Sequence, residues 1–413
     1  MRIDRDTCEE ILATITRNKT RSVLTAFSVF WGIFLLTVLL GGGHGLQAMM
    51  NAQFEGFATN SGFIASQQTG EAYKGFRKGR WWSLEIQDVE RLRFAVDGLD
   101  IISPVYSSWG ISAVYGDKKY DCMVKGLYPD YASIEQPQMS YGRFINDVDL
   151  REARKVCVIG KRVYEQLFPF GGDPCGEYIR VNGVYYRIVG VNVSEGNINI
   201  NGPASQSIIL PFTTMSQTFH SGRNVDIICI TAKKGLRITD VLPEVERVVK
   251  EAHFVAPHDK QALMTLNMES MFSMVENLFT GIDILILMVG LGTLLAGVIG
   301  VSNIMMVTVR ERTMEIGIRR AIGAKPFDIL QQILSESIVL TFIAGMSGIT
   351  FAVLVLQAVE MGVAATGQVA QFQVSFGTAV GTCILLVTLG VFAGLAPAYR
   401  AMSVKPIDAI RDE

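Results

Sequence analysis

Four stretches of the chain are almost entirely apolar, and each is long enough to cross a bilayer. A membrane-spanning helix requires about 20 apolar residues in succession. None of the four stretches has a lysine or an arginine in its interior, which is not expected of helices buried in a soluble protein. The pattern therefore predicts four transmembrane helices, at residues 21–41, 282–309, 326–356 and 376–399.

A cleaved signal peptide is the alternative for the first stretch. Its apolar core is longer than the roughly 7–15 residues typical of a signal peptide, and no small-residue cleavage site follows it. A segment of mixed charge, residues 1–20, also precedes it. These features favour a membrane helix.

Lysines and arginines near the ends of the apolar stretches predict the orientation of the chain, because cytoplasmic loops carry an excess of both. They are frequent in residues 1–20, 310–325 and 400–413, and residues 357–375 contain none. We therefore expect the first three segments to be cytoplasmic. The short loop 357–375 and the large segment 42–275 are then extracytoplasmic.

The segment 42–275 is long enough to form a domain with its own core, and its pattern is mixed α/β. Asn182-Gly183 joins two strand-like runs and is a strong hairpin signal, because both residues tolerate positive φ. The other expected elements are a hairpin turning at Gly116-Asp117, a strand leading into a helix in 155–168, a strand in 225–232 and a helix in 238–253. The predicted fold class is thus a four-helix membrane protein with a large α/β domain between its first two helices.

Composition and motifs exclude several function classes. The net charge of −2 argues against a nucleic-acid-binding protein. No stretch matches GxxxxGK[ST], so the chain is not expected to bind ATP through a P-loop. No residue spacing supports a metal site or a catalytic arrangement, so we predict neither a cofactor nor an enzyme. The basic and aromatic stretch "GFRKGRWW", residues 75–82, predicts packing or contact with the outer lipid interface.

The densest charge cluster, "RERTMEIGIRRAIGA" at residues 310–324, lies between the second and third apolar stretches. Helical spacing predicts that Glu315 pairs with Arg319, and that an amphipathic helix lies under the membrane with its charged face outward. A solvated loop would explain the arginines but not the glutamates or the apolar stripe. The stripe consists of Met314, Ile318, Ala321 and Ile322.

The ends of this helix are also readable from the sequence. Gly323 is expected to end it, because glycine adopts the left-handed conformation without steric cost. Pro326 suits the start of the next helix, and Asp328 is favourably placed in its first turn.

The stretch "GVSNIMMVTVRERTMEIGIRRAIGA" resembles the MacB/FtsX family of ABC transporter permeases, in which a membrane helix leads into a cytoplasmic coupling helix. The resemblance extends over essentially the whole chain. Further similar stretches are "RNKTRSVLTAFSVFWGI", "GRFINDVDLREARKVCVIGKRVYEQLFP", "DPCGEYIRVNGVYYRIVGV" and "GLAPAYRAMSVKPIDAIRDE".

The resemblance implies a permease subunit in the bacterial inner membrane, with its large domain in the periplasm. A separate ABC ATPase subunit would bind the ATP and drive export. Further implied partners are membrane lipid, a second copy or a paralogue of the chain, a periplasmic adaptor and an outer-membrane exit duct. An FtsX-like scaffold for a cell-wall hydrolase and a lipoprotein-releasing permease are the alternatives. The size of the outer domain favours the MacB-like exporter.

We predict that the coupling helix contacts the ATPase through its charged residues. Ile316, Gly317 and Ile318 would pack beneath them, and Gly323 would end the helix. Glu336 is expected to pair with a cytoplasmic arginine, and Asn303 to form an interhelical hydrogen bond. The predicted contact residues are Arg310, Glu311, Arg312, Glu315, Arg319 and Arg320.

A long helix is predicted to join the outer domain to this site. From Met268 to Arg312 the chain contains no proline, and a continuous helix of that length would span roughly 65 Å. The extension of the first span could pair with it, although the glycines at 41–43 are expected to interrupt that extension.

Overall fold

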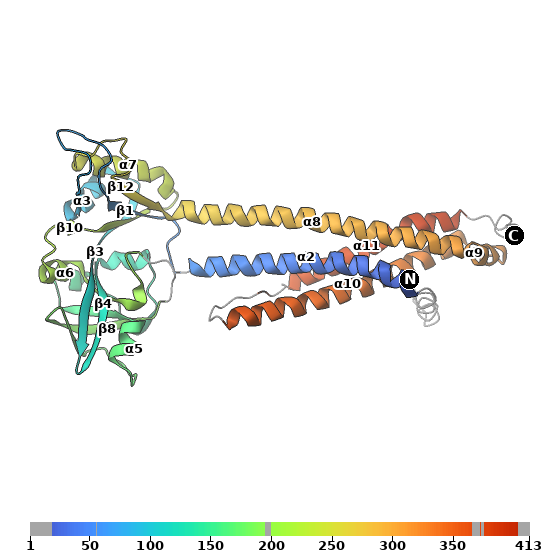
Figure 1. The fold of residues 1–413 in the computed structure, drawn as a ribbon, viewed down its shortest axis with the longest axis horizontal. Coiled ribbons are helices and arrows are strands. Elements are labelled where there is room, and N and C mark those ends of the chain that lie inside the picture. The colour runs from blue at the N-terminus through green and yellow to red at the C-terminus, as the bar shows by residue number, and fades with distance from the viewer. Residues whose placement is uncertain (1–18, 55, 195–199, 366–371, 373–375, 404–413) are drawn as a thin grey trace. The chain divides into compact units, whose positions relative to one another are not determined.

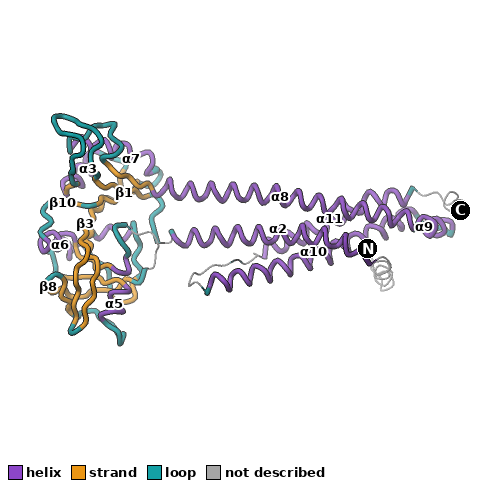
Figure 2. Tube along the Cα trace, viewed as in Figure 1, coloured by secondary structure: helices purple, strands orange, loops and turns teal. Residues whose placement is uncertain are grey.

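The computed structural model describes residues 19–54, 56–194, 200–365, 372 and 376–403. The chain divides into two compact units, one formed by residues 1–50 with 277–413 and the other by residues 51–276. Most of the predicted segments 1–20 and 400–413, and much of the loop 357–375, lie outside the described residues. Among the described residues, every strand belongs to the second unit (Figure 2).

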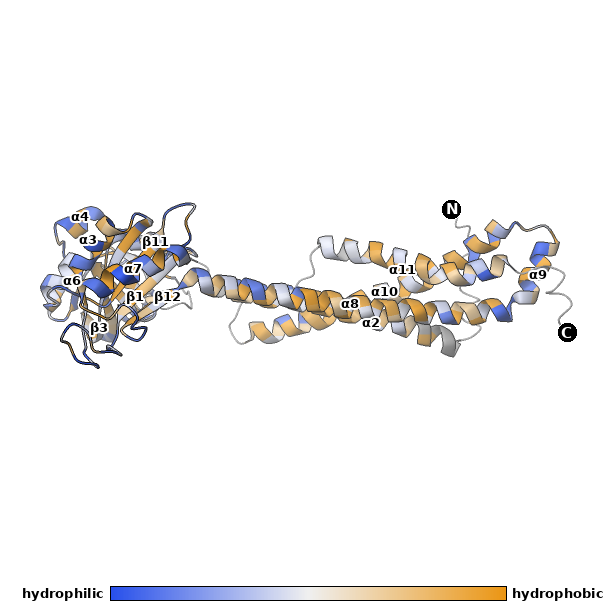
Figure 3. Cartoon of the chain, turned by 90° about the horizontal axis from the view of Figure 1, so that it is seen from above, coloured by the Kyte–Doolittle hydropathy of each residue, from blue (hydrophilic) through white to orange (hydrophobic). Residues whose placement is uncertain are grey.

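The first unit is helical (Figure 1). Among the described residues, four of its helices are long and apolar enough to cross a membrane, as predicted (Figure 3). Its helices are α2 (Lys19–Gln53), α8 (Met268–Glu311), α9 (Thr313–Ala321), α10 (Pro326–Ala364) and α11 (Phe376–Met402).

Two expectations about helix continuity have different outcomes. The proline-free helix is confirmed, because α8 runs without a break over 44 residues. The predicted break at residues 41–43 is wrong, because α2 continues through these glycines to Gln53. Each glycine costs a helix about 1 kcal/mol. In an apolar environment that cost is smaller than the cost of leaving backbone groups without hydrogen bonds.

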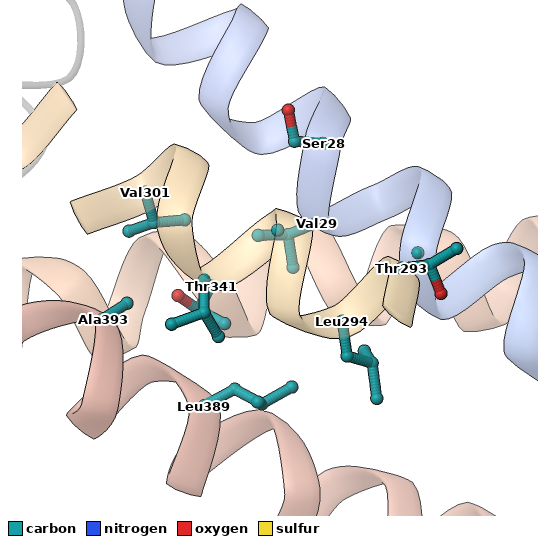
Figure 4. A pocket seen from close by; sticks show the side chains of 11 residues that line it. Ser28, Val29, Thr293, Leu294, Val301, Thr341, Leu389 and Ala393 are labelled. Atoms are coloured by element: carbon teal, nitrogen blue, oxygen red, sulfur yellow. The ribbon is translucent and has the colours of Figure 1, made fainter. Parts of the chain in front are cut away.

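Small residues let the membrane helices approach closely. A Cβ at Gly348 of α10 would lie 2.8 Å from the Phe30 carbonyl oxygen of α2. A gap between α2, α8, α10 and α11 is lined by Ser28, Thr293 and Thr341 together with apolar side chains (Figure 4). Each of these three hydroxyls donates to a carbonyl of its own helix, at 3.2, 3.0 and 2.8 Å respectively. The gap is therefore effectively apolar.

The second unit is built on a sheet of ten strands among the described residues, in the order β12-β1-β11-β3-β4-β9-β6-β8-β5, with β7 pairing both β3 and β8. A separate pair joins β2 (Leu84–Glu85) to β10 (Asn224–Val225). The strands of the large sheet are β1 (Ser61–Ser66), β3 (Leu99–Tyr115), β4 (Lys118–Leu127), β5 (Met139–Gly142), β6 (Val156–Gly160), β7 (Tyr178–Val181), β8 (Val184–Asn192), β9 (Ser207–Pro211), β11 (Ile227–Ala232) and β12 (Leu263–Asn267).

Part of this sheet closes on itself. Because β7 pairs with both β3 and β8, the strands β3, β4, β9, β6, β8 and β7 form a ring. Buried side chains such as Ile159, Tyr186 and Ile208 belong to one core cluster contributed by these strands. Closure leaves no free edge within the ring.

The rest of the sheet is covered by helices. A second core cluster joins β1, β3 and β11 to α3 (Ile86–Ala95) and α7 (Ile238–Ala252). The remaining elements of this unit are the helices α4 (Asp147–Arg151), α5 (Lys161–Leu167) and α6 (Phe212–Phe219), and the 3-10 turns at Pro129–Ser133 and Ala204–Gln206.

The structure confirms the local predictions for this domain. Asn182 and Gly183 have φ of 48° and 83°, and Val181 pairs with Val184 across the predicted turn. The hairpin at Gly116-Asp117 is also present, because Tyr115 pairs with Lys118. The predicted strand–helix unit, strand and helix correspond to β6–α5, β11 and α7.

A buried carboxylate makes the stability of this domain depend on pH. Asp149 lies 2.6 Å from an Arg143 guanidinium nitrogen and accepts a hydrogen bond from the Asn146 backbone N–H at 3.1 Å. Burial raises the pKa of Asp149, but the hydrogen bonds from Arg143 and Asn146, with the charges of Arg143 and Arg154, outweigh burial and hold this pKa below its usual range.

Since the folded-state pKa is lowered, the charged carboxylate stabilises the domain above the unfolded pKa of about 3.9, and this contribution is lost as pH falls through the folded value. We expect Asp149→Asn to lower the free energy of unfolding by about 2 kcal/mol at pH 7, the scale of hydrogen bonds to a charged group. Urea unfolding from neutral pH to below pH 4 should show the difference shrinking. A difference that does not change with pH would contradict this assignment.

Candidate coupling site

The candidate site is the segment between α8 and α10. Helix α8 ends at Glu311, and Arg312 leaves the helical conformation with φ −100° and ψ 14° before α9 begins. Gly323 has φ +112°, the left-handed conformation predicted for the residue after this helix. Helix α10 begins at Pro326, and the Lys325 N–H donates to the Asp328 carboxylate at 3.1 Å, so the predicted start is also present.

Side chains of α9 are tied to α10 by polar contacts. Glu315 and Arg319 form the predicted ion pair at 2.9 Å. Arg319 also donates to the Gln332 side-chain oxygen on α10 at 3.1 Å. The short helix is thereby fixed against the start of the next membrane helix.

A buried carboxylate lies deeper in the same interface. Glu336 of α10 is 7% exposed, and its side-chain oxygen lies 3.4 Å from an Arg312 nitrogen. This is the predicted pairing of Glu336 with an arginine, and it joins the α8–α9 junction to α10. Arg312, Arg319, Gln332 and Glu336 line a cavity between these three helices.

The last turn of α11 is held by the same segment. Arg320 donates to the Met402 carbonyl oxygen at 2.8 Å. The final carbonyls of a helix have no partner within that helix, and a cation at this end interacts favourably with the helix dipole. Arg320 therefore links α9 to α11, in addition to the contacts with α10.

The structure corrects the predicted faces of α9. Ile316 and Gly317 are buried, as predicted. Ile318 is 42% exposed and does not pack beneath the charges, and Met314 and Ile322 are 62% and 83% exposed. Ile316 instead joins the core cluster that includes Ile329 and Ile333 of α10, so the side of α9 centred on Ile316 faces inward. The predicted stripe, together with Arg310, Glu311 and Glu315, is exposed.

The predicted interhelical hydrogen bond of Asn303 is not formed within the described chain, because Asn303 is exposed on α8. The buried residues Val301 and Met305 face the bundle. Asn303 follows Val301 by two residues, a rotation of roughly 200° about the helix axis, so its side chain points away from the bundle.

Sequence reasoning missed two partners at this site. Gln332 lies one turn before Glu336, and two polar residues four apart in an apolar helix could have indicated a shared polar face. The Met402 carbonyl could not be predicted as a partner of Arg320, because every residue has a backbone carbonyl and the sequence does not distinguish one from another.

Known families match both units of the chain. Residues 22–248 match the MacB-like periplasmic core domain, and residues 287–406 match the FtsX-like permease C-terminal domain. These matches, with the four apolar helices, define a multi-pass membrane protein of the ABC transporter permease class. The chain belongs to the MacB/FtsX-like permease family, as its sequence resemblance implied.

Individual relatives share less than 30% of their residues with this chain. The chain is 28% identical over 405 residues to the macrolide export ATP-binding/permease protein MacB of Bdellovibrio bacteriovorus, covering 97% of this chain and 60% of the relative. It is 27% identical over 401 residues to the pyoverdine export ATP-binding/permease protein PvdT of Pseudomonas putida, covering 96% of this chain and 58% of the relative. The chain thus spans about 60% of the length of these curated relatives.

Solved structures of extracytoplasmic domains are also similar. The periplasmic region of MacB from Actinobacillus actinomycetemcomitans gives a TM-score of 0.43 at 20% identity, covering 54% of this chain and 96% of that structure. The extracellular domain of the transporter YknZ from Gram-positive bacteria gives a TM-score of 0.42 at 18% identity, covering 50% of this chain and 100% of that structure.

Proposed function

We propose that this chain is the permease subunit of a MacB-like exporter, and that it transmits motion from a separate ABC ATPase subunit to its α/β domain. The observation that carries the proposal is the construction of α9. This helix is anchored to α10 and α11 by Arg312, Arg319 and Arg320, yet it leaves other side chains exposed. ATP would be bound by the ATPase partner.

The exposed side of α9 suits a protein partner. Met314, Ile318 and Ile322 supply apolar area, and Glu315 and Arg310 beside them supply charges of both signs. Interfaces combine an apolar centre with complementary charges that fix the register of the partners. An interface of this kind would let the ATPase move α9 as a lever.

Movement of α9 has a direct route along the chain. Arg312 alone separates α9 from α8, which is helical from Met268 to Glu311. At about 1.5 Å per residue, 44 residues span roughly 66 Å. We propose that displacement of α9 reaches the α/β domain through this helix.

The proposed setting is the bacterial inner membrane, with α9 in the cytoplasm and the α/β domain in the periplasm. A second copy or a paralogue would complete the permease. Asn303 supports that proposal, because an asparagine exposed on an apolar helix is expected to find a hydrogen-bond partner on another helix. A periplasmic adaptor and an outer-membrane exit duct are the further partners expected of an exporter.

The test is Glu315→Ala/Arg319→Ala in the full chain, reconstituted with its ATPase. The ion pair is partly exposed and contributes about 0.5 kcal/mol or less, and the lost Arg319–Gln332 hydrogen bond contributes about 1 kcal/mol, so insertion should be preserved. A loss of about 1.4 kcal/mol in docking would reduce ATPase binding about ten-fold. We expect ATP-dependent changes in hydrogen exchange of the α/β domain to decline accordingly, while the ATPase alone still hydrolyses ATP.

The matched control is Glu244→Ala/Arg247→Ala, which removes the two exposed ion pairs of Arg247 on α7, with Glu244 at 3.6 Å and with Glu251 at 3.5 Å. If both double variants showed the same ATP-dependent changes in hydrogen exchange, Glu315 and Arg319 would have no part in the mechanism.

A cysteine at Thr313 should be labelled only from the cytoplasmic side, and labelling from outside would overturn the topology. Capture of a cell-wall hydrolase would favour the FtsX-like scaffold, and bound lipoprotein would favour the lipoprotein-releasing permease.

A further inference from the structure

A basic, aromatic loop in the α/β domain has no role in the proposed transmission of motion. This basic loop, residues 69–81, lies between β1 of the large sheet and β2 of the separate strand pair. It carries four cations within seven residues, from Lys74 to Arg80, in a chain whose net charge is −2. Such local positive charge needs its own explanation.

The basic loop has a defined conformation. Tyr73 and Phe76 exchange two backbone hydrogen bonds, of 3.0 and 2.9 Å, across a two-residue turn. The turn residues Lys74 and Gly75 have φ of 46° and 87°, as in the tight turns of β-hairpins. At the base of the loop, the Thr69 N–H donates to the Arg80 carbonyl at 3.0 Å.

Contacts with the segment after α7 fix this base further. The buried Asp259 carboxylate accepts hydrogen bonds from the backbone N–H groups of Gly70 and Glu71, at 2.7 and 3.2 Å. Arg80 donates to the His253 carbonyl at 2.6 Å. A loop that is already ordered loses little conformational entropy when it binds a ligand.

The side chains of the loop combine cations with exposed rings. The Arg80 guanidinium lies 4.1 Å from the centre of the Phe76 ring. Trp81 is 75% exposed and Phe76 is 43% exposed. Arg77 and Lys78 are exposed, and within the described chain they form no hydrogen bond or ion pair. Their charges are therefore available to an external anion.

We propose that the basic loop binds an anionic lipid surface. Phosphate headgroups would neutralise Arg77 and Lys78, and Trp81 would lie at the level of the headgroups, where tryptophan is enriched in membrane proteins. An acidic protein fits less well. A stable protein interface uses about 20–30 residues a side and is depleted in lysine, whereas this loop offers 13 residues and includes two lysines.

The test is a sedimentation assay with the full chain in neutral phosphatidylcholine nanodiscs. Added vesicles contain phosphatidylglycerol, or phosphatidylcholine alone. We expect the nanodiscs to sediment with the anionic vesicles only, and more weakly at high salt. Arg77→Gln/Lys78→Gln should weaken this binding about 25-fold, or about five-fold for each cation. The assay contains no ATPase, so its outcome is independent of the proposed function.

Lys233→Gln/Lys234→Gln is the matched control, because it removes two adjacent exposed cations elsewhere in the same domain. This variant should bind like the unaltered chain. Equal binding to both vesicle types, or equal loss in both double variants, would overturn the proposal. Binding to soluble polyglutamate without binding to anionic vesicles would also overturn it and would identify an acidic-peptide site instead.

Discussion

Glu336→Leu is expected to destabilise the membrane unit by about 3–5 kcal/mol, the cost of removing one member of a buried ion pair. Glu336 and Arg312 have side-chain exposures of only 8% and 23%, so water screens the interaction between the two charges only in part. Thermal unfolding in detergent would measure the loss. Hydrogen exchange would locate it at the α8–α9 junction.

The double variant Arg312→Leu/Glu336→Leu distinguishes the ion pair from simple packing. Replacing both charges with apolar groups is often nearly neutral, so this variant should recover most of the lost stability. Arg400→Leu is the control, because Arg400 is exposed on α11 and its loss should cost less than about 0.5 kcal/mol. If the double variant were as unstable as Glu336→Leu, the interaction between the two charges would not be the cause.

Gly160→Ala is expected to destabilise the α/β domain strongly, although it adds only one methyl group. Gly160 ends β6 and precedes α5, and an added Cβ would lie 2.3 Å from the Ala204 carbonyl oxygen and 2.5 Å from that of Ser205. Both obstacles are backbone atoms, so no side chain can rotate away. Overpacking of this kind costs about 3 kcal/mol. Hydrogen exchange of the β6 amides should show the destabilisation.

Gly172→Ala separates this steric effect from backbone strain. Gly172 has φ +97°, and an added Cβ would meet no atom within 4 Å. Its replacement should cost about 1 kcal/mol through the left-handed backbone alone. If Gly160→Ala cost no more than Gly172→Ala, the close approach of Ala204 and Ser205 would not limit residue size at position 160.

The elements that could be predicted from the sequence are those encoded locally. An apolar run predicts a membrane helix because its length and lack of charge are sufficient, and Asn182-Gly183 predicts a hairpin because two adjacent residues determine the turn. The ion pair of Glu315 and Arg319 is local in the same sense, since four-residue spacing places both on one helix face.

Features that depend on distant partners were missed or misassigned. The ring of strands closes only because β7 reaches β3, which lies more than sixty residues earlier at Val114↔Arg180. Helical periodicity identified the stripe on α9 but could not decide whether Ile316 or Ile318 faces α10. That choice follows from the packing of Ile316 with Ile329 and Ile333, which no local pattern encodes.

The pairing of strand β3 determines how the α/β domain unfolds. Its first part, from Leu99 to Val105, pairs with β11, and its second part, from Tyr106 to Tyr115, pairs with β4. One uninterrupted strand thus contributes to both cores, so loss of either core frays the strand that the other requires. The regions of the α/β domain around these two cores should therefore unfold as a single cooperative unit, and a destabilising substitution in one region lowers the folded population of both.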